Sequence, residues 1–147
     1  GRNMFCIFCE IAAKRIPAQI VYEDGEVIAF MDLMPITKGH VLVVPKVHAE
    51  NLYELTPAAA AAMIPAAQKI AAALRASGLP CEGLNLQMAN GKVAGQSVFH
   101  AHLHIIPRNA GDGFGLRFPP GYGREADKEE LTATAERIRT ALAAKPA

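Results

Sequence analysis

The sequence has almost no excess of charge of either sign: 15 lysines and arginines stand against 14 aspartates and glutamates, a net charge of +1. Proteins that bind a nucleic-acid backbone usually carry a basic excess on one face, so we expect no nucleic-acid partner. No apolar run approaches the roughly 20 residues that span a bilayer, and we expect no membrane partner. The segment 1–6 also lacks the apolar region of a signal peptide. These absences predict a cytoplasmic protein; whether residues 1–3 are native stays open.

Cysteine is scarce, with three residues in the chain. In the cytoplasm these thiols should be reduced. Cys81 stands alone, and we interpret it as a small buried hydrophobic residue. Cys6 and Cys9 form a Cys-x-x-Cys pair, whose spacing suits a redox pair or half of a zinc site and also occurs by chance.

The hydrophobic residues, 51% of the 147, suffice for a core in one domain that covers residues 1–147. Apolar runs bounded by turn residues predict the strands, and the run at 41–45 suits a central strand covered on both faces. The Asp24-Gly25 turn joins the first two. The predicted strands are 20–22, 27–31, 41–45, 84–88 and 99–106.

Three helices are expected between and after these strands. A short one covers 8–15. A long one begins at Thr56-Pro57, is kinked at Pro65 and ends at Ser77-Gly78. After a Gly- and Pro-rich ordered loop at 109–124, Asp127 and Glu130 form a capping-box pattern that opens a final amphipathic helix. The order of elements predicts an α+β domain with a mostly antiparallel sheet of about five strands, one long helix and a C-terminal helix.

Three of the five histidines lie within five residues, at His100, His102 and His104. On a strand, alternate side chains share one face, roughly 6.6–7 Å apart. A single histidine there would usually be a core residue, but three would crowd one face with polar rings that each need partners. Two chemistries fit: a zinc site, or nucleophilic attack by an imidazole whose N–H is held by a carbonyl.

The segment 90–97, Asn-Gly-Lys-Val-Ala-Gly-Gln-Ser, lies directly upstream of the histidines. Glycine backbones can approach an anion closely, and consecutive N–H groups can form an anion-binding nest. Gln96 and Ser97 add side-chain donors, and Lys92 adds charge. This loop beside a histidine cluster predicts a phosphate cradle and favours nucleophilic catalysis.

The run 96–106, with histidine alternating with apolar residues, resembles the signature of the histidine-triad (HIT) family. Four further blocks resemble that family in the same order, at 7–11, 29–35, 39–48 and 90–92. The resemblance covers about residues 5–108, and within the family the chain looks like the compact bacterial-type branch similar to the Hint nucleotide-binding proteins.

This resemblance implies a nucleotide hydrolase or nucleotidyl transferase that acts on the α-phosphate of a nucleoside phosphoramidate or a dinucleoside polyphosphate. His102 would attack the phosphorus and form a nucleotidyl-histidine, and His104 would donate to phosphate oxygens. The implied catalytic set is His100, His102, His104 and Ser97. The implied substrate-binding set is Asp32 for the ribose hydroxyls, Asn90, Gln96 and Ser97 for the phosphate and leaving group, and Ile7, Phe8, Ile11, Phe30, Leu33 and Leu42 for the nucleoside. Asp32 also has a simpler interpretation as a turn cap before Pro35.

The resemblance also implies a structural zinc ion held by Cys6, Cys9, His48 and His100, a closed tetrahedral set. His40 would support the sheet. A purine nucleotide as substrate, a homodimer and no organic cofactor are implied as well.

Two other functions fit the same residues. A zinc-dependent hydrolase would use the three histidines as ligands, although no acidic residue adjoins them to act as a base. A nucleotide-binding regulatory or scaffold protein would need little catalysis, because a shared fold does not fix function. The leaving group is not fixed by the sequence, and the loop 109–124 is where we expect specificity to lie.

Overall fold

The computed structural model describes residues 5–144. Residues 1–3, which the sequence does not identify as native or foreign, lie outside the described part. By contacts, the chain divides into a first unit that ends at Phe114 and a second that begins at Gly115. We describe each unit by itself. The expectation of a single domain over 1–147 stays a prediction.

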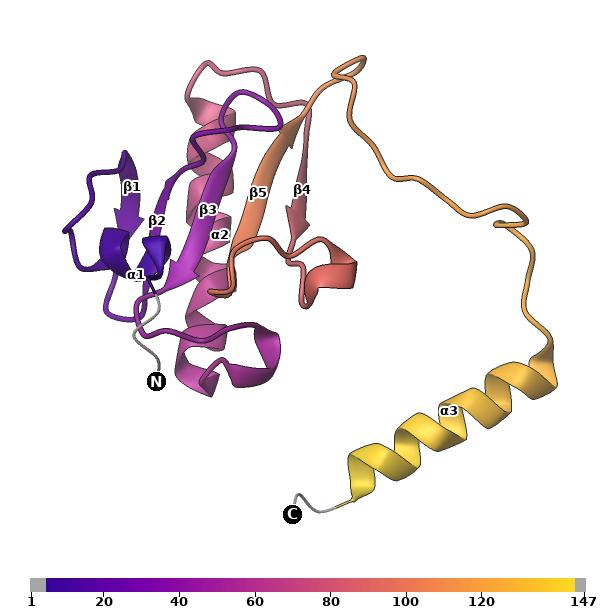
Figure 1. The fold of residues 1–147 in the computed structure, drawn as a ribbon. Helices are drawn as coiled ribbons and strands as arrows, with labels where there is room; N and C mark the ends of the chain where they lie inside the picture. The colour runs from indigo at the N-terminus through magenta and orange to yellow at the C-terminus, as the bar shows by residue number, and fades with distance from the viewer. Residues whose placement is uncertain (1–4, 145–147) are drawn as a thin grey trace. The chain divides into compact units, whose positions relative to one another are not determined.

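The first unit is built on a five-stranded antiparallel sheet in the order β1-β2-β3-β5-β4 (Figure 1). The strands are β1 (Ile20–Glu23), β2 (Val27–Met31), β3 (Val41–Pro45), β4 (Gly83–Gln87) and β5 (Leu103–Arg108). Its helices are α1 (Ile7–Ala12) and α2 (Pro57–Ala76), with 3-10 turns at Leu52–Glu54 and Lys92–Ala94. This confirms the predicted α+β architecture, with β3 as the buried central strand.

Helix α2 begins and ends at the predicted residues. The Thr56 hydroxyl accepts the Ala59 N–H at 3.1 Å, and the Ser77 hydroxyl donates to the Leu74 carbonyl at 2.7 Å. The helix continues through Pro65. Among residues 5–144 it is the one helix with the length and composition to cross a membrane, so the expectation that no apolar segment approaches that length was wrong. Its buried residues face the sheet, as in a core helix.

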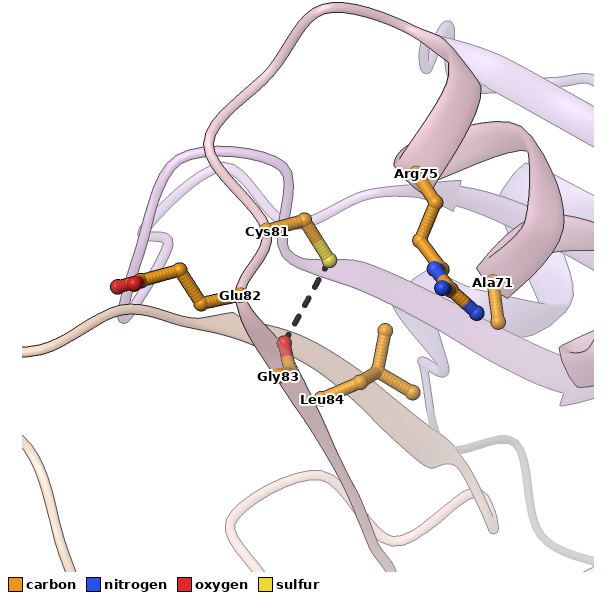
Figure 2. A pocket seen from close by; sticks show the side chains of 6 residues that line it. All are labelled: Ala71, Arg75, Cys81, Glu82, Gly83 and Leu84. Atoms are coloured by element: carbon orange, nitrogen blue, oxygen red, sulfur yellow. Dashed lines mark hydrogen bonds between the residues drawn. The ribbon is translucent and has the colours of Figure 1, made fainter.

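A small pocket lies between the end of α2 and the start of β4, and Cys81 lines it together with Arg75 and Leu84 (Figure 2). The Cys81 thiol donates to the Gly83 carbonyl at 3.5 Å. The residue is half-buried and packs against the core, so the prediction of a buried hydrophobic residue is only partly correct.

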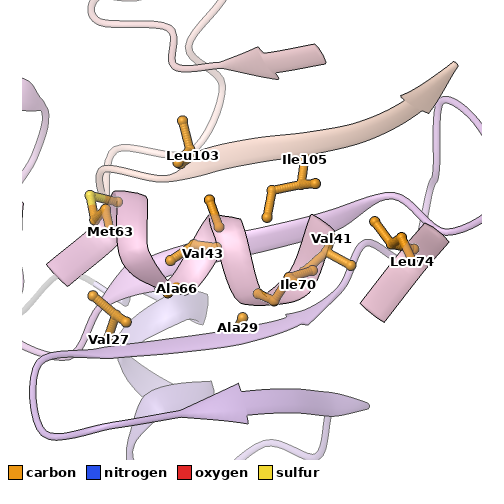
Figure 3. Packing of buried hydrophobic residues seen from close by; sticks show 11 residues of the cluster. Val27, Ala29, Val41, Val43, Met63, Ala66, Ile70, Leu74, Leu103 and Ile105 are labelled. Carbon is orange, nitrogen blue, oxygen red and sulfur yellow. The ribbon is translucent and has the colours of Figure 1, made fainter. Parts of the chain in front are cut away.

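Side-chain alternation sends the strand residues into two clusters. On one face the strands pack against α2, as Figure 3 shows, through Val27, Ala29, Val41, Val43, Leu103 and Ile105. On the other face they pack against α1 through Ile28, Phe30, Leu42 and Val44, which contact Phe8 and Ile11. Because β3 contributes to both clusters, it is covered on both faces, as its uninterrupted apolar run predicts.

The strand predicted from residue 99 begins only at Leu103, so the prediction was wrong for His100 and His102. The reason lies in the neighbouring strand. Pro45 has no N–H to donate to a ladder, and its carbonyl accepts the His100 ring N–H instead of a backbone N–H. The Ala101 N–H donates to the Ala49 carbonyl at 2.7 Å, outside the sheet. Helix α1 also ends earlier than predicted, before Lys14, which has a left-handed φ of 64°.

Gly39 precedes the buried His40 in a crowded left-handed position, with φ of 94°. A Cβ there would lie 3.2 Å from Pro107 Cγ and 3.3 Å from Leu74 Cδ2. We expect Gly39→Ala to lower the free energy of unfolding by about 1–3 kcal/mol. Urea unfolding measures this, with Gly25→Ala as the control, because a Cβ at Gly25 meets nothing within 4 Å. Equal effects of the two substitutions would contradict the prediction.

The second unit contains helix α3 (Lys128–Ala143). The Asp127 carboxylate accepts the Glu130 N–H at 3.2 Å, which confirms the predicted cap. The helix carries the predicted apolar positions Leu131, Ala135, Ile138 and Leu142. Of the predicted loop 109–124, the start belongs to the first unit and is ordered by Arg108, which binds the Asp112 carboxylate with two N–H groups at 2.8 and 2.9 Å.

Candidate active site and metal centre

The ring of His102 is held in one orientation by the backbone just before it. Its Nδ1 lies 2.8 Å from the His100 carbonyl oxygen. A carbonyl can only accept, so Nδ1 carries the proton and Nε2 keeps its lone pair. The edge of Phe8 packs on the ring, with centroids 5.1 Å apart. The buried His102 therefore has the form that a nucleophilic imidazole requires.

His104 is set in the opposite form by a chain of hydrogen bonds. The Ile36 backbone N–H donates to His40 Nδ1 at 3.0 Å, so His40 carries its proton on Nε2. That Nε2 lies 2.9 Å from His104 Nδ1 and donates to it. His104 in turn carries its proton on Nε2. Its ring lies against that of His102, with centroids 4.8 Å apart. The site thus contains two neighbouring rings of opposite form: His102 Nε2 has a free lone pair, and His104 Nε2 carries a proton that it can donate.

Burial keeps this hydrogen-bonded pair of histidines neutral. It lowers the pKa of His40, and it lowers the pKa of His104 to about 4, with a further contribution from the nearby His102 and His40 rings. Neutral rings are needed here, because two protonated rings would place two N–H groups against each other.

The unfolding free energy should therefore depend on pH through His104. The unfolded ring titrates near ~6.5 and the folded one near 4, so between these values the unfolded chain binds more protons and stability falls as the pH falls. One such group contributes a slope of at most about 1.4 kcal/mol per pH unit, and less here because the ring is only partly buried.

Urea unfolding of the wild type and His104→Gln at several pH values between 4 and 6.5 measures this contribution. The substitution should reduce the slope. Equal slopes for the two proteins would contradict the shifted pKa of His104.

Asp32 lies beside this pair and serves two contacts. One carboxylate oxygen accepts the Met34 N–H at 2.9 Å, which is the turn-cap contact. The other lies 3.6 Å from His40 Nε2, and the Asp32 side chain as a whole is partly exposed. Its contact with a ribose stays a prediction, and this second oxygen is the one available for it.

Asp32, His40 and His104 lie close enough to hold a metal ion, with one ligand atom of each within 4.8 Å of the others. The hydrogen bonds argue against that use. A ligating nitrogen must offer a lone pair, whereas His40 Nε2 is protonated because its Nδ1 accepts a backbone N–H. We interpret this cluster as a chain of hydrogen bonds that fixes which nitrogen of His40 and of His104 carries the proton.

The second cluster, Cys6, Cys9, His48 and His100, has the geometry of a metal centre. The His48 and His100 Nδ1 atoms lie 3.2 Å apart, the Cys6 sulfur is 3.3 Å from His100 Nδ1, and the Cys9 sulfur is 3.4 Å from His48 Nδ1. A tetrahedron around zinc has ligand–ligand edges of roughly 3.3–3.8 Å. His100 Nε2 donates to the Pro45 carbonyl at 2.8 Å, so its Nδ1 lone pair faces the sulfurs. The residues fit a closed Cys₂His₂ zinc site.

Two features show that this cluster lacks charge compensation of its own. Burial and the neighbouring Cys6 raise the pKa of the Cys9 thiol to about 11. Burial lowers the pKa of His100 to about 4, so its ring stays neutral. A metal ion would supply the missing positive charge, because binding of the ion displaces the thiol protons and stabilises both thiolates.

The three triad histidines do not converge on one point, which argues against the zinc-dependent hydrolase. His100 Nδ1 faces the cysteines, while His102 Nδ1 binds a carbonyl and His104 Nδ1 accepts from His40. The sequence prediction that they share one face must be refined: His100 belongs to the metal cluster, and His102 and His104 form the active site.

The loop 90–97 uses much of its hydrogen-bonding capacity internally. The buried Gln96 amide donates to the Glu50 and Val98 carbonyls and accepts the Gly91 N–H. Asn90 Oδ1 accepts the Leu52 N–H at 2.8 Å. Gln96 therefore has no N–H left for a phosphate in this arrangement, contrary to the predicted cradle. Its side chain instead holds the loop in place through these three hydrogen bonds. Ser97 is exposed and lines a hollow that also contains Cys6, Cys9 and His48, and its contact with a phosphate stays a prediction.

The predicted nucleoside-binding residues differ in exposure. Phe8, Ile11, Phe30 and Leu42 are buried in the cluster under α1, whereas Ile7 is partly exposed and Leu33 is 90% exposed. The buried ones form core beneath the surface of the site, and contact with a nucleoside stays a prediction for all six. The sequence analysis missed the contact of Phe8 with both His100 and His102. The aromatic residue within Cys-x-x-Cys was the available signal.

The model of the HIT domain matches residues 13–111, and the chain belongs to the HIT family, as its histidine pattern indicates. It is 55% identical over 111 residues to Protein hit of Bacillus subtilis, covering 75% of this chain and 76% of that protein. It is 36% identical over 140 residues to adenosine 5'-monophosphoramidase hnt1 of Schizosaccharomyces pombe, covering 95% and 99%.

Solved structures show the same fold. A HIT family protein from Bacillus subtilis superposes with a TM-score of 0.86 at 46% identity, covering 98% of this chain and 100% of that one. A zinc-bound histidine triad family protein from Mycobacterium smegmatis gives a TM-score of 0.71 at 39% identity, covering 92% and 96%. The family contains nucleotide-binding proteins and nucleotide hydrolases.

Proposed function

We propose that this protein hydrolyses or transfers the nucleotidyl group of a purine nucleoside phosphoramidate or dinucleoside polyphosphate through a covalent intermediate on His102. The observation that carries the proposal is the His102 Nδ1–H held by the His100 carbonyl, which leaves the Nε2 lone pair for attack. The relative named as an adenosine 5'-monophosphoramidase supports the phosphoramidate class.

In the first step, His102 Nε2 attacks the α-phosphorus and the bond from phosphorus to the leaving group breaks; a nitrogen leaves as the amine after taking a proton from solvent, and an oxygen leaves as a phosphate oxyanion. The ring becomes positively charged, and its Nδ1–H bond to the His100 carbonyl strengthens because the donor is now cationic. The His104 Nε2–H donates to a phosphate oxygen on which negative charge grows. In the second step, water attacks the phosphorus, its proton passes to solvent, and the nucleotide and a neutral His102 are released.

We further propose that Cys6, Cys9, His48 and His100 hold a structural zinc ion. The zinc-bound relative and the four converging ligand atoms support this. A closed set of four protein ligands leaves no position for substrate, so the ion would tie the terminal segment to the sheet.

A panel of adenosine phosphoramidates and dinucleoside polyphosphates, with steady-state kinetics on purified protein, tests the proposed activity. Turnover of at least one class, with a nucleotidyl group found on the protein during turnover, supports it. Tight nucleotide binding without turnover of either class would favour the regulatory or scaffold function. Activity that requires added metal and leaves no covalent intermediate would favour the zinc-dependent hydrolase.

The proposed ribose contact gives a separate prediction for Asp32→Asn, which keeps an oxygen for the Met34 N–H and removes the charge. Hydrogen bonds to a charged acceptor contribute roughly 1.5–3 kcal/mol. Ribonucleotide Kd should therefore rise about tenfold to a hundredfold, while 2',3'-dideoxy analogues should lose little. Calorimetric titration of both ligands measures this, and equal losses would make Asp32 a turn cap only.

A further inference from the structure

His100 links the metal cluster to the active site through a single residue. Its side chain faces Cys6, with Nδ1 3.3 Å from the sulfur. Its main-chain carbonyl accepts the His102 Nδ1–H at 2.8 Å, the bond that orients the nucleophile. A change in the metal cluster that shifts the backbone of His100 therefore also moves the carbonyl on which the orientation of His102 depends.

Phe8 gives a second link between the same two sites. It lies between the two cysteines in α1, so its backbone is fixed by the segment that carries both sulfurs. Its ring packs edge-on against His100 and His102, with centroids 5.8 and 5.1 Å away. A rearrangement of the Cys6–Cys9 turn can therefore change both contacts that position His102, its hydrogen bond to the His100 carbonyl and its packing on Phe8.

The sulfurs are close to each other and reachable from solvent. The Cys9 N–H donates to the Cys6 sulfur at 3.4 Å, and the cluster's ligand atoms lie within 4.8 Å of one another. Both cysteines are partly exposed and line a hollow that also contains His48, Ser97 and Phe99. The spacing Cys-x-x-Cys at the start of a helix is the one that redox-active pairs use.

We propose that Cys6 and Cys9 form a reversible thiol switch that turns the proposed nucleotidyl transfer off under peroxide. Cys6 attacks a peroxide oxygen as its thiolate, the O–O bond breaks, and sulfenic acid and hydroxide form. The hydroxide takes the proton of the Cys9 thiol, and the resulting thiolate attacks the sulfenic sulfur and releases hydroxide as the disulfide forms. Overall, two thiols and one hydrogen peroxide give one disulfide and two waters, and a dithiol reductant reverses the change.

The disulfide removes both thiolates from the set of four metal ligands. Two histidines alone do not complete a closed zinc site, so a bound ion should leave with the oxidation. His100 then loses its two thiolate neighbours on the Nδ1 side, and the Cys6–Cys9 turn contracts to bring the sulfurs into a bond. Both changes act on the contacts that position His102. The activity part of this proposal rests on the proposed function; the thiol and metal parts do not.

The purified protein is treated with hydrogen peroxide, then with a dithiol reductant, and four quantities are followed. These are free thiols, zinc released to a chromogenic chelator, the thermal unfolding midpoint and turnover of an adenosine phosphoramidate. Cys81→Ser is the matched control because Cys81 lies in a separate pocket (Figure 2). It leaves the pair as the protein's remaining thiols. Cys6→Ser combined with Cys81→Ser removes the partner needed for a disulfide.

We expect the Cys81→Ser protein to lose two thiols and one zinc, to unfold at a lower temperature, and to lose at least about tenfold in turnover, all restored by reductant and zinc. The double variant should show no reversible disulfide. Oxidation and zinc release without loss of turnover would overturn the coupling, and so would loss of turnover in which the thiols of the pair stay reduced. If the untreated protein has no turnover, the proposed function fails, while thiol count, zinc release and unfolding still decide whether the pair is a switch.

Discussion

His102→Ala should leave the fold intact and lower kcat for adenosine phosphoramidates by about 10³-fold or more. The covalent step depends on the attacking nitrogen itself, and losses of this size accompany removal of a nucleophile in other enzymes. The ring is buried but makes one hydrogen bond, to the His100 carbonyl, and packs on Phe8. Steady-state kinetics measure the loss, with zinc content and thermal unfolding as controls for folding.

A variant that retained more than about a tenth of the wild-type kcat would exclude His102 as the nucleophile. His104→Gln provides the comparison within the same site. It removes a donor to the phosphate and should therefore cost activity, but less than removal of the nucleophile, since one transition-state donor contributes roughly 10²–10³-fold.

Loss of the metal centre should have the largest effect on stability. Cys6→Ser should reduce bound zinc well below one per chain and lower the free energy of unfolding by several kcal/mol, because ligands that converge only in the folded chain couple metal binding to folding. Elemental analysis and thermal unfolding measure both. Cys81→Ser is the control and should keep its zinc, because its thiol contacts only the Gly83 carbonyl among the recorded hydrogen bonds of the described residues.

Two outcomes would contradict this account of the metal. In the first, wild-type protein purified without chelator holds no metal and unfolds at the same temperature as Cys6→Ser. The four residues would then not form a stabilising metal site. Metal bound by His102 or His104 would be more serious, because it would occupy the lone pair that attack requires.

Local sequence signals predicted the regular elements well. The Asp24 carboxylate accepts the Glu26 and Val27 N–H groups in the turn read from the Asp-Gly pair. The Thr56 and Asp127 caps and the buried run of β3 follow equally from neighbouring residues. In each case the deciding interaction lies within a few positions of the residue that predicts it.

The errors arose where distant segments compete for the same backbone group. Alternation alone extends β5 back to residue 99, but the Pro45 carbonyl accepts the His100 ring, 55 residues away in sequence. Gln96 was predicted to contact phosphate from its place beside the histidines, yet its amide binds the Glu50 carbonyl across the fold. The tautomers of His40 and His104 likewise depend on the Ile36 N–H, a contact that no residue pattern specifies.

The most direct test of the central claim is to trap the covalent intermediate. Protein mixed with an adenosine phosphoramidate and quenched within one turnover is digested, and the mass of each peptide is measured. The account predicts an added adenylyl group on His102 that appears before product and is absent in His102→Ala. Turnover with the group on another residue, or with none on the protein at any time, would contradict it.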